Sequence, residues 1–510
     1  MFNKLKYDIP ASLVIFFVAI PLCLGIALAS GAPLFSGIIA GIVGGIIVGT
    51  TSSSALGVSG PAAGLVVIVY AAVNTLGSWE AFLTAVVLAG ILQLMMGFAR
   101  AGFIAYFFPS SVIKGMLTGI GLLIILKQIP YLLGYVNGSN LSDFQADGET
   151  TLHAIRNAAN AIIPEIVTIS ILSLIVLVLW DTVLTKKYKL FQFIQGPIVV
   201  VLLGILMTTL AKSGILNLTL LQDQLVSLPV STNLLEFFGH FTFPDFSSLM
   251  KLKLWETAAI LAIVASLETL LCVEATDRLD PNKRVTPANR ELIAQGMGNI
   301  ISGLCGGLPI TQVIVRSSAN IEFGAKTKLS AILHGVYLLV SVATIAEVLN
   351  MIPLASLASI LIIVGYKLAK PTLFKQMYQL GSEQFVPFIG TIVGILVTDL
   401  LKGIVIGLLL GIFFTLRHSY RNAYHMKDLT TTEQGRTVHH LVLAQEVSFF
   451  NKANIIKALE AIPPNSGVII DCTHSKSIAY DVVEFIRDYK KNAQLKGINV
   501  EMIGFIEPAS

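Results

Sequence analysis

The chain has 510 residues, of which 55% are hydrophobic and 13% are charged. Soluble domains carry about 25% charged residues, so this composition excludes an ordinary soluble protein and indicates that most of the chain lies in lipid. The net charge of +4, from 34 Lys and Arg against 30 Asp and Glu, is too small to indicate a nucleic-acid partner. The four cysteines stand far apart and have neither disulfide nor zinc spacing.

The first half of the chain contains a series of apolar runs. A helix of about 20 apolar residues spans the hydrocarbon core of a bilayer. The first run continues into further runs and does not end at a cleavage site, so we expect a retained span and no signal peptide. The spans expected here are 12–29, 34–50, 80–99, 104–128, 164–184 and 192–211.

Two shorter apolar runs are interrupted by glycine and proline. Gly60-Pro61 precedes a run that reaches only Tyr70, and Gly306 to Pro309 precedes the run Thr311–Ile321. Short, broken segments at membrane depth predict half-helices that line a binding site. Each break is the third segment of its half, so we expect an inverted repeat with halves at about 8–211 and 254–417.

The second half adds more spans and then changes character. Its long segments are expected at 254–275, 291–304, 328–347, 350–368, 385–401 and 403–416, which gives about fourteen membrane segments with both half-helices. Lys and Arg cluster in loops such as 277–290 on the side of the amino terminus, so the positive-inside rule places that terminus in the cytoplasm. We therefore expect a transmembrane domain at 1–417.

The last part, 418–510, has the composition of a soluble domain. Its pattern predicts strands at 438–444, 467–471 and 498–505 and helices at 454–461 and 479–493. Strands that alternate with helices indicate a small α/β domain, which the topology places in the cytoplasm.

Glu268 lies near the middle of the expected span 254–275. A carboxylate at that depth costs about 2.5 kcal/mol or more unless something compensates it. A structural hydrogen bond is one explanation, but acids inside spans mostly mark ion or substrate pathways. We expect Glu268 to bind Na⁺ or to carry a proton, with Cys272 on the same helix face.

The half-helix ends predict an anion site. Unpaired N–H groups and the positive ends of helix dipoles attract anions. Arg316, about one turn into the second half-helix, adds a full charge, unless it only forms a structural salt bridge with an acid such as Glu268 or caps a helix end. The expected anion-binding residues are Gly60, Pro61, Ala62, Ala63, Thr311, Gln312, Val313 and Arg316, and those expected around the coupling ion are Glu268, Cys272, Gln312, Val313 and Ile314.

Several motifs together make the chain resemble the sulfate permease family of anion transporters, solute carrier family 26 in animals. They are Asp8-Ile9-Pro10-Ala11, Ser59-Gly60-Pro61, Ser266 to Leu271 with Asp277-Arg278, Asn289-Arg290-Glu291-Leu292, and Gly306 to Pro309 with Arg316-Ser317. The resemblance implies a seven-plus-seven inverted repeat, usually dimeric, whose core domain moves like an elevator against a gate domain. It also implies a cytoplasmic STAS domain and an anion site between the third and tenth segments.

The chain departs from that family at three places. Many members have Thr where this chain has Ala62, and a hydroxyl-rich stretch where it has Gln312 to Val315. Gln312 or backbone N–H groups must then do more of the anion binding. In the tail, Ala479-Tyr480 replaces a common Asp-Ser pair, so a phosphoserine switch is not expected there.

These observations lead us to predict a bacterial inner-membrane transporter with no cofactor, coupled to Na⁺ or H⁺. Na⁺-coupled bicarbonate uptake comes first, because Val112 to Met116 and the Glu268 helix resemble the bicarbonate branch. H⁺-coupled symport of sulfate, or of another oxyanion or a dicarboxylate, is the alternative. An anion channel and a nucleobase permease remain open as other classes. An enzyme is excluded, because the spacing shows no nucleophile–base pair or metal-ligand cluster.

Overall fold

The computed structural model describes residues 4–103, 109–135, 151–160, 162–187, 195–216, 220–230, 234–398, 400–421, 423–429 and 437–504. They form two compact units, one of Met1–Gln379 with Phe388–Val405 and one of Leu380–Pro387 with Ile406–Ser510. The expected span 104–128 begins in residues outside the described part.

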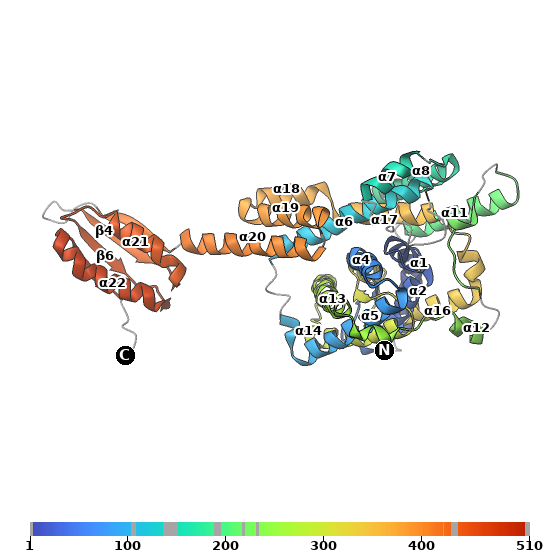
Figure 1. The fold of residues 1–510 in the computed structure, drawn as a ribbon, viewed down its shortest axis with the longest axis horizontal. Coiled ribbons are helices and arrows are strands. Elements are labelled where there is room, and N and C mark those ends of the chain that lie inside the picture. The colour runs from blue at the N-terminus through green and yellow to red at the C-terminus, as the bar shows by residue number, and fades with distance from the viewer. Residues whose placement is uncertain are drawn as a thin grey trace. The chain divides into compact units, whose positions relative to one another are not determined.

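Helices dominate the large unit (Figure 1). In the first half they are α1 (Leu5–Ala29), α2 (Leu34–Val43) with η2 (Gly44–Val48) and α3 (Gly49–Thr51), α4 (Val66–Leu76), α5 (Trp79–Phe98), α6 (Ser110–Leu133), α7 (Thr151–Asn160), α8 (Pro164–Leu179) with η5 (Trp180–Leu184) and α9 (Thr185–Lys187), and α11 (Gly196–Lys212). In the second half they are α12 (Leu234–Gly239), α13 (Leu252–Leu279), α14 (Ala288–Leu304), α15 (Ile314–Glu322), α16 (Leu329–Leu349), α17 (Leu354–Leu368), α18 (Pro371–Gln379) and most of α19 (Ser382–Val397). Most of α20 (Leu400–Arg421) belongs to the small unit.

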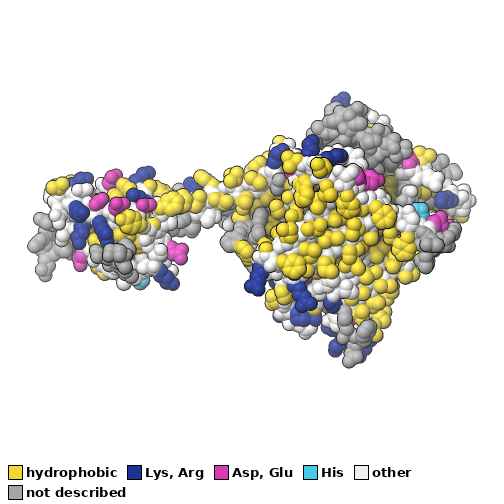
Figure 2. Space-filling model, turned by 60° about the horizontal axis from the view of Figure 1, so that its bottom comes forward, with side chains coloured by type: hydrophobic (Ala, Val, Ile, Leu, Met, Phe, Trp, Pro, Cys, Tyr) yellow, Lys and Arg dark blue, Asp and Glu magenta, His cyan; other side chains and the backbone are white. Residues whose placement is uncertain are grey.

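Their length and composition suit a bilayer. In the described part of the chain, eight helical segments are long and apolar enough to cross a membrane, and three shorter apolar helices accompany them. Figure 2 shows hydrophobic side chains over a broad face of this unit, with Lys and Arg gathered at its edges. A face of this kind is what lipid covers.

The two breaks contain strands where half-helix ends were expected. β1 (Ser59–Pro61) pairs antiparallel with β2 (Ile310–Gln312), so that Gly60 lies opposite Thr311. The first half-helix begins only at Val66, after the 3-10 turn η3 (Ala63–Leu65), and the second begins at Ile314 and not at Thr311. The expected starts were wrong because backbone groups without water need partners, and the two breaks supply them to each other.

The two halves of the large unit pack in a matching way. α1 packs on α16 and α13 packs on α5, while α6 packs on α17. In an inverted repeat α1 corresponds to α13, α5 to α16 and α6 to α17. The contact of α1 with α16 therefore corresponds to that of α13 with α5, and the contact of α6 with α17 corresponds to itself. Figure 1 shows α6, α17 and α8 together, beside the group that holds α1, α4 and α13.

The small unit has an α/β arrangement. A sheet runs β3–β4–β6–β8, in which β3 is antiparallel and the other three strands are parallel to one another. The strand 424–429 was missed, because its residues Tyr-His-Met-Lys-Asp-Leu lack clear alternation. The elements are β3 (Tyr424–Leu429), β4 (Val438–Leu443), β5 (Glu446–Val447), α21 (Lys452–Glu460), β6 (Gly467–Asp471), β7 (Ser477–Ile478), α22 (Tyr480–Ala493) and β8 (Asn499–Ile503).

Candidate functional site

A cavity of about 180 Å³ lies beside the two breaks. Its charged lining residues are Glu268 from α13 and Arg316 from α15. The cavity is bounded on one side by α1, α13 and the breaks, and on the other by α6 and α17; the apolar lining comprises Leu22, Ile26, Leu117, Leu271, Ala275, Val315, Leu361, Val364 and Leu368. This volume holds a small ion with a few waters, since one water takes up about 30 Å³.

The Glu268 carboxylate is held by the first break. The backbone N–H of Gly64 donates to Oε1 at 3.3 Å, while Oε2 has no hydrogen-bond partner among the described residues. A Cβ on Gly64 would lie only 2.5 Å from Oε2, so the carboxylate occupies the space that a side chain would fill. Only a glycine at position 64 allows this approach.

The Arg316 guanidinium is held by the same break, four residues earlier, at Gly60 of β1. Its side chain is 1% exposed, and a Cβ on Gly60 would lie 2.3 Å from Nη1. Nη2 donates to the Cys23 sulfur of α1 at 3.3 Å, whereas Nε and Nη1 have no partner in the described part of the chain. A buried guanidinium with open donors is an incomplete anion site.

Glu268 and Arg316 do not neutralise each other. No ion pair joins them among the described residues, which removes the salt-bridge explanation of Arg316. Their free polar atoms, Oε2 on one side and Nε and Nη1 on the other, belong to residues that line the same cavity. The cavity therefore combines a negative and a positive group, each with unused hydrogen-bonding capacity.

A buried polar network fixes the two breaks on α14. Asn299 accepts from the Ile310 N–H at 2.6 Å and donates to the Ile310 carbonyl at 3.0 Å. Gln295 donates to Ser59 Oγ at 2.8 Å and to Glu291 Oε1 at 3.0 Å. These bonds satisfy strand atoms that have no water nearby, and they set the position from which α4 and α15 start.

The structure brings together some of the expected site residues and separates others. Cys272, Pro61, Ala63, Val313 and Ile314 line the cavity with Glu268 and Arg316, and Gly60 touches the guanidinium. The side chains of three expected residues, Ala62, Thr311 and Gln312, are buried and do not line it.

The hydrogen bonds of Gln312 bear on its expected role in anion binding. Its amide donates to Thr276 Oγ1 at 3.0 Å, and its backbone N–H reaches Thr269 Oγ1 at 3.4 Å. The Val313 N–H is taken by the Val58 carbonyl. These donors are engaged within the fold, so of the two expected replacements for the missing hydroxyls, Gln312 or backbone N–H groups, the hydrogen bonds favour the backbone groups.

Sequence reasoning missed Gly64 and the cavity walls. The pair Gly60 and Gly64, four residues apart in the first break, was an available signal, because each glycine admits one charged group. The apolar lining residues of α1, α6 and α17 carried no signal, since they look like any other residue of an apolar span.

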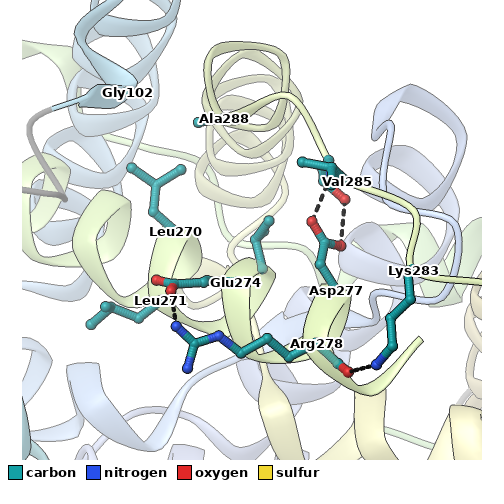
Figure 3. Close-up of a pocket in the computed structure, with 11 residues that line it drawn as sticks. Gly102, Leu270, Leu271, Glu274, Asp277, Arg278, Lys283, Val285 and Ala288 are labelled. Carbon is teal, nitrogen blue, oxygen red and sulfur yellow. Dashed lines mark hydrogen bonds and ion pairs between the residues drawn. The ribbon is translucent and has the colours of Figure 1, made fainter. Parts of the chain in front are cut away.

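A second cavity of about 520 Å³ lies where α13 turns toward α14 (Figure 3). Asp277 accepts from the Thr286 N–H at 2.6 Å and from its hydroxyl at 2.8 Å, and Arg278 pairs with Glu274. The Lys283 ammonium donates to the Arg278 carbonyl. Because these charges already have partners in the turn, this cavity is a weaker candidate than the one beside the breaks.

The sequence model of the Sulfate permease family matches residues 5–391, which is most of the chain. The chain belongs to this family. The bicarbonate transporter BicA of Picosynechococcus sp. is 24% identical over 401 residues, covering 77% of this chain and 67% of that protein. The chloroplastic sulfate transporter 4.1 of Arabidopsis thaliana is 27% identical over 364 residues, covering 70% of this chain and 50% of that protein.

A solved structure extends this likeness to the fold. Murine solute carrier 26 family member A9, an anion transporter in the inward-facing state, matches with a TM-score of 0.78 at 14% identity, over 99% of this chain and 86% of that one. Sulfate permease relatives carry anions, so this chain is a multi-pass membrane anion transporter and not an enzyme. Among the described residues, no group of three His, Cys, Asp or Glu side chains gathers to hold a metal.

Proposed function

We propose that the chain takes up a small inorganic anion in symport with a cation that binds Glu268. The observation that carries this proposal is the cavity between the breaks, in which a carboxylate and a guanidinium each keep a free polar atom. Two opposite charges without a mutual ion pair suit the joint binding of an anion and a cation. The anion then binds beside the guanidinium and the cation beside the carboxylate, so neither ion approaches only a group of the same charge.

The anion is proposed to bind at Arg316 and at the first turn of α15. A helix start leaves N–H groups unsatisfied. Those of Gln312 and Val313 are already bonded and that of Ile314 points at the Cys272 sulfur, so the groups of Val315 and Arg316 remain as donors. The cavity volume is sufficient for bicarbonate or sulfate together with waters.

Na⁺ is the proposed coupling ion and bicarbonate the proposed anion. Glu268 offers one hard oxygen ligand. The Val313 carbonyl already accepts from the Ser317 N–H and hydroxyl, so waters in the cavity beside Val313 and Ile314 would supply the other ligands. BicA, a bicarbonate transporter, is a relative over most of the chain. Sulfate with H⁺ is the second candidate, because Oε2 of Glu268 has no described partner and can take a proton, and other relatives are named as sulfate transporters.

The movement is proposed to occur at the cavity. The group of α1, α13 and the breaks faces the pair α6 and α17 across it, so a shift of the first group against the second would carry the bound ions. We further propose a homodimer in a bacterial inner membrane, with the amino terminus and a STAS-type small unit in the cytoplasm. The basic turn with Arg278, Lys283 and Arg284 supports that topology.

Uptake into proteoliposomes tests the proposal. Labelled bicarbonate, sulfate and uracil are each offered with a Na⁺ gradient at fixed pH and with a pH gradient without Na⁺. We expect bicarbonate uptake that rises steeply with Na⁺. Sulfate uptake that ignores Na⁺ and follows the pH gradient would favour the second candidate, and uracil uptake or channel-sized currents would overturn anion symport.

The variant Glu268→Gln tests the coupling residue. It keeps the size of the side chain but removes its charge, so we expect concentrative uptake to disappear. Glu256→Gln is the matched control, because Glu256 is an exposed carboxylate on the same helix. Concentrative uptake that survives in Glu268→Gln would show that the carboxylate is structural.

A further inference from the structure

Lys127 of α6 lies directly over the ring of Tyr70 of α4. The ammonium nitrogen is 3.4 Å from the ring centroid, which is a close cation–π contact. Among the described residues, Lys127 has no ion pair or hydrogen bond. Lys127 is half-buried, so its ammonium is only partly hydrated, and the ring face is the contact that compensates the lost hydration.

This contact lies beyond one end of the Glu268 cavity. Gly64 lies beside Glu268 in the 3-10 turn that precedes α4, and Tyr70 of α4 comes six residues later, about 9 Å farther along the chain axis. On α6, Leu117 lines the cavity and Lys127 follows ten residues later, about 15 Å farther along.

The contact of Lys127 with Tyr70 lies toward one particular end of the helix bundle. α5 follows α4 after the turn at Gly77, and Thr84 near its start donates to the Asp245 carbonyl at 2.8 Å, just before α13 begins. The end of α4 and the start of α13 therefore share one end of the bundle, which we call the outer end. The cavity instead continues from Glu268 along α13 to Cys272 and Ala275, toward the opposite end.

We propose that Lys127 and Tyr70 form the outer gate of the anion route, and that Lys127 is the first residue to bind the anion once this gate opens. When α4 separates from α6, the ammonium loses the ring that compensates it and needs an anion. The contact joins the two groups of helices that border the cavity, so it must break whenever the site turns to the outer end. The anion-binding role of Lys127 rests on the proposed function. The gate itself rests on the fold alone.

Sided transport kinetics test the anion-binding role. Lys127→Met should raise the KM for bicarbonate about tenfold in vesicles whose outer end faces the substrate, and leave the KM from the other side unchanged. Lys127→Arg should leave the KM for bicarbonate unchanged from both sides. Lys114→Met is the matched control, because Lys114 is a half-buried lysine at the other end of α6. An equal change from both sides, or none, would overturn the role.

Thiol labelling tests the gate without any transport assay. Cys272 lines the cavity, so a membrane-impermeant methanethiosulfonate applied from the outer end should modify it slowly in the wild type. In Tyr70→Ala it should react about tenfold faster, because the ring no longer holds α4 and α6 together. Tyr70→Phe keeps the ring and should behave as wild type, and Cys272→Ala should remove the added labelling.

The two readouts separate the two claims. Unchanged labelling in Tyr70→Ala would overturn the gate even if transport is as proposed. Faster labelling in a protein that carries none of the offered anions would support the gate and contradict the proposed function.

Discussion

Gly64→Ala should weaken cation coupling without unfolding the protein. A Cβ at this position would lie 2.5 Å from Oε2 and 2.6 Å from Oε1 of Glu268. A normal contact is about 3.5 Å, so the carboxylate has to withdraw by roughly 1 Å. The neighbour that moves is the end of a side chain, so the fold can adjust while the ion site cannot.

The magnitude follows from that displacement. A shift of about 1 Å in a group that binds a reacting partner can cost about 100-fold. We therefore expect the concentration of Na⁺ for half-maximal uptake to rise between tenfold and 100-fold, with the KM for the anion little changed. Gly60→Ala should raise the KM for the anion and leave the Na⁺ concentration for half-maximal uptake little changed, since its Cβ would lie 2.3 Å from Arg316 Nη1.

Proteoliposome uptake at varied Na⁺ and varied bicarbonate measures both constants for both variants. Gly239→Ala is the matched control, because a Cβ there meets nothing within 4 Å. Thermal unfolding in detergent checks that each variant is folded. If Gly64→Ala and Gly60→Ala affect the two ions equally, the assignment of one glycine to each ion is refuted.

Three further predictions concern the scaffold around the cavity. Asn299→Ala leaves the Ile310 N–H and carbonyl unpaired, at about 1–3 kcal/mol for each group, and should lower the Tm in detergent; an unchanged Tm would contradict the role of the network. Gln312→Ala should leave the anion KM unchanged because its amide bonds α13 and not the cavity; a tenfold rise would restore the original expectation. Burial acts to raise the Asp280 pKa, but hydrogen bonds and the charge of Arg284 outweigh it and lower the pKa. A carboxyl with a depressed pKa stabilises the fold above its unfolded pKa of about 3.9 and loses that contribution as the pH falls through the folded value. Arg284→Met should therefore lower the Tm at neutral pH, and the difference from wild type should shrink below about pH 4; a constant difference would be evidence against this pair.

Much of the architecture could be predicted from local sequence. The apolar runs predicted the membrane fold, because a bilayer leaves a backbone few alternatives to a helix. The same rule drew attention to Gly60-Pro61, to Gly306 through Pro309, and to Glu268, whose charge is out of place in an apolar run. Most elements of the small unit were also predictable, since their periodicity is local.

Other features depend on the meeting of distant segments. β1 pairs with β2, which lies about 250 residues away in the sequence, and this pairing makes the half-helices start later than expected. Local sequence does not show such a distant partner.

The sequence by itself determined that two broken segments and a buried acid exist, because a chain in lipid cannot hide an unsatisfied backbone or an uncompensated charge. Only the tertiary structure decided that Gly60 admits Arg316, that Gly64 admits Glu268, and that Gln312 turns away from both. The reason is geometric: the direction of a side chain at a helix start depends on where that helix begins and on how it packs, and both depend on contacts between the two halves.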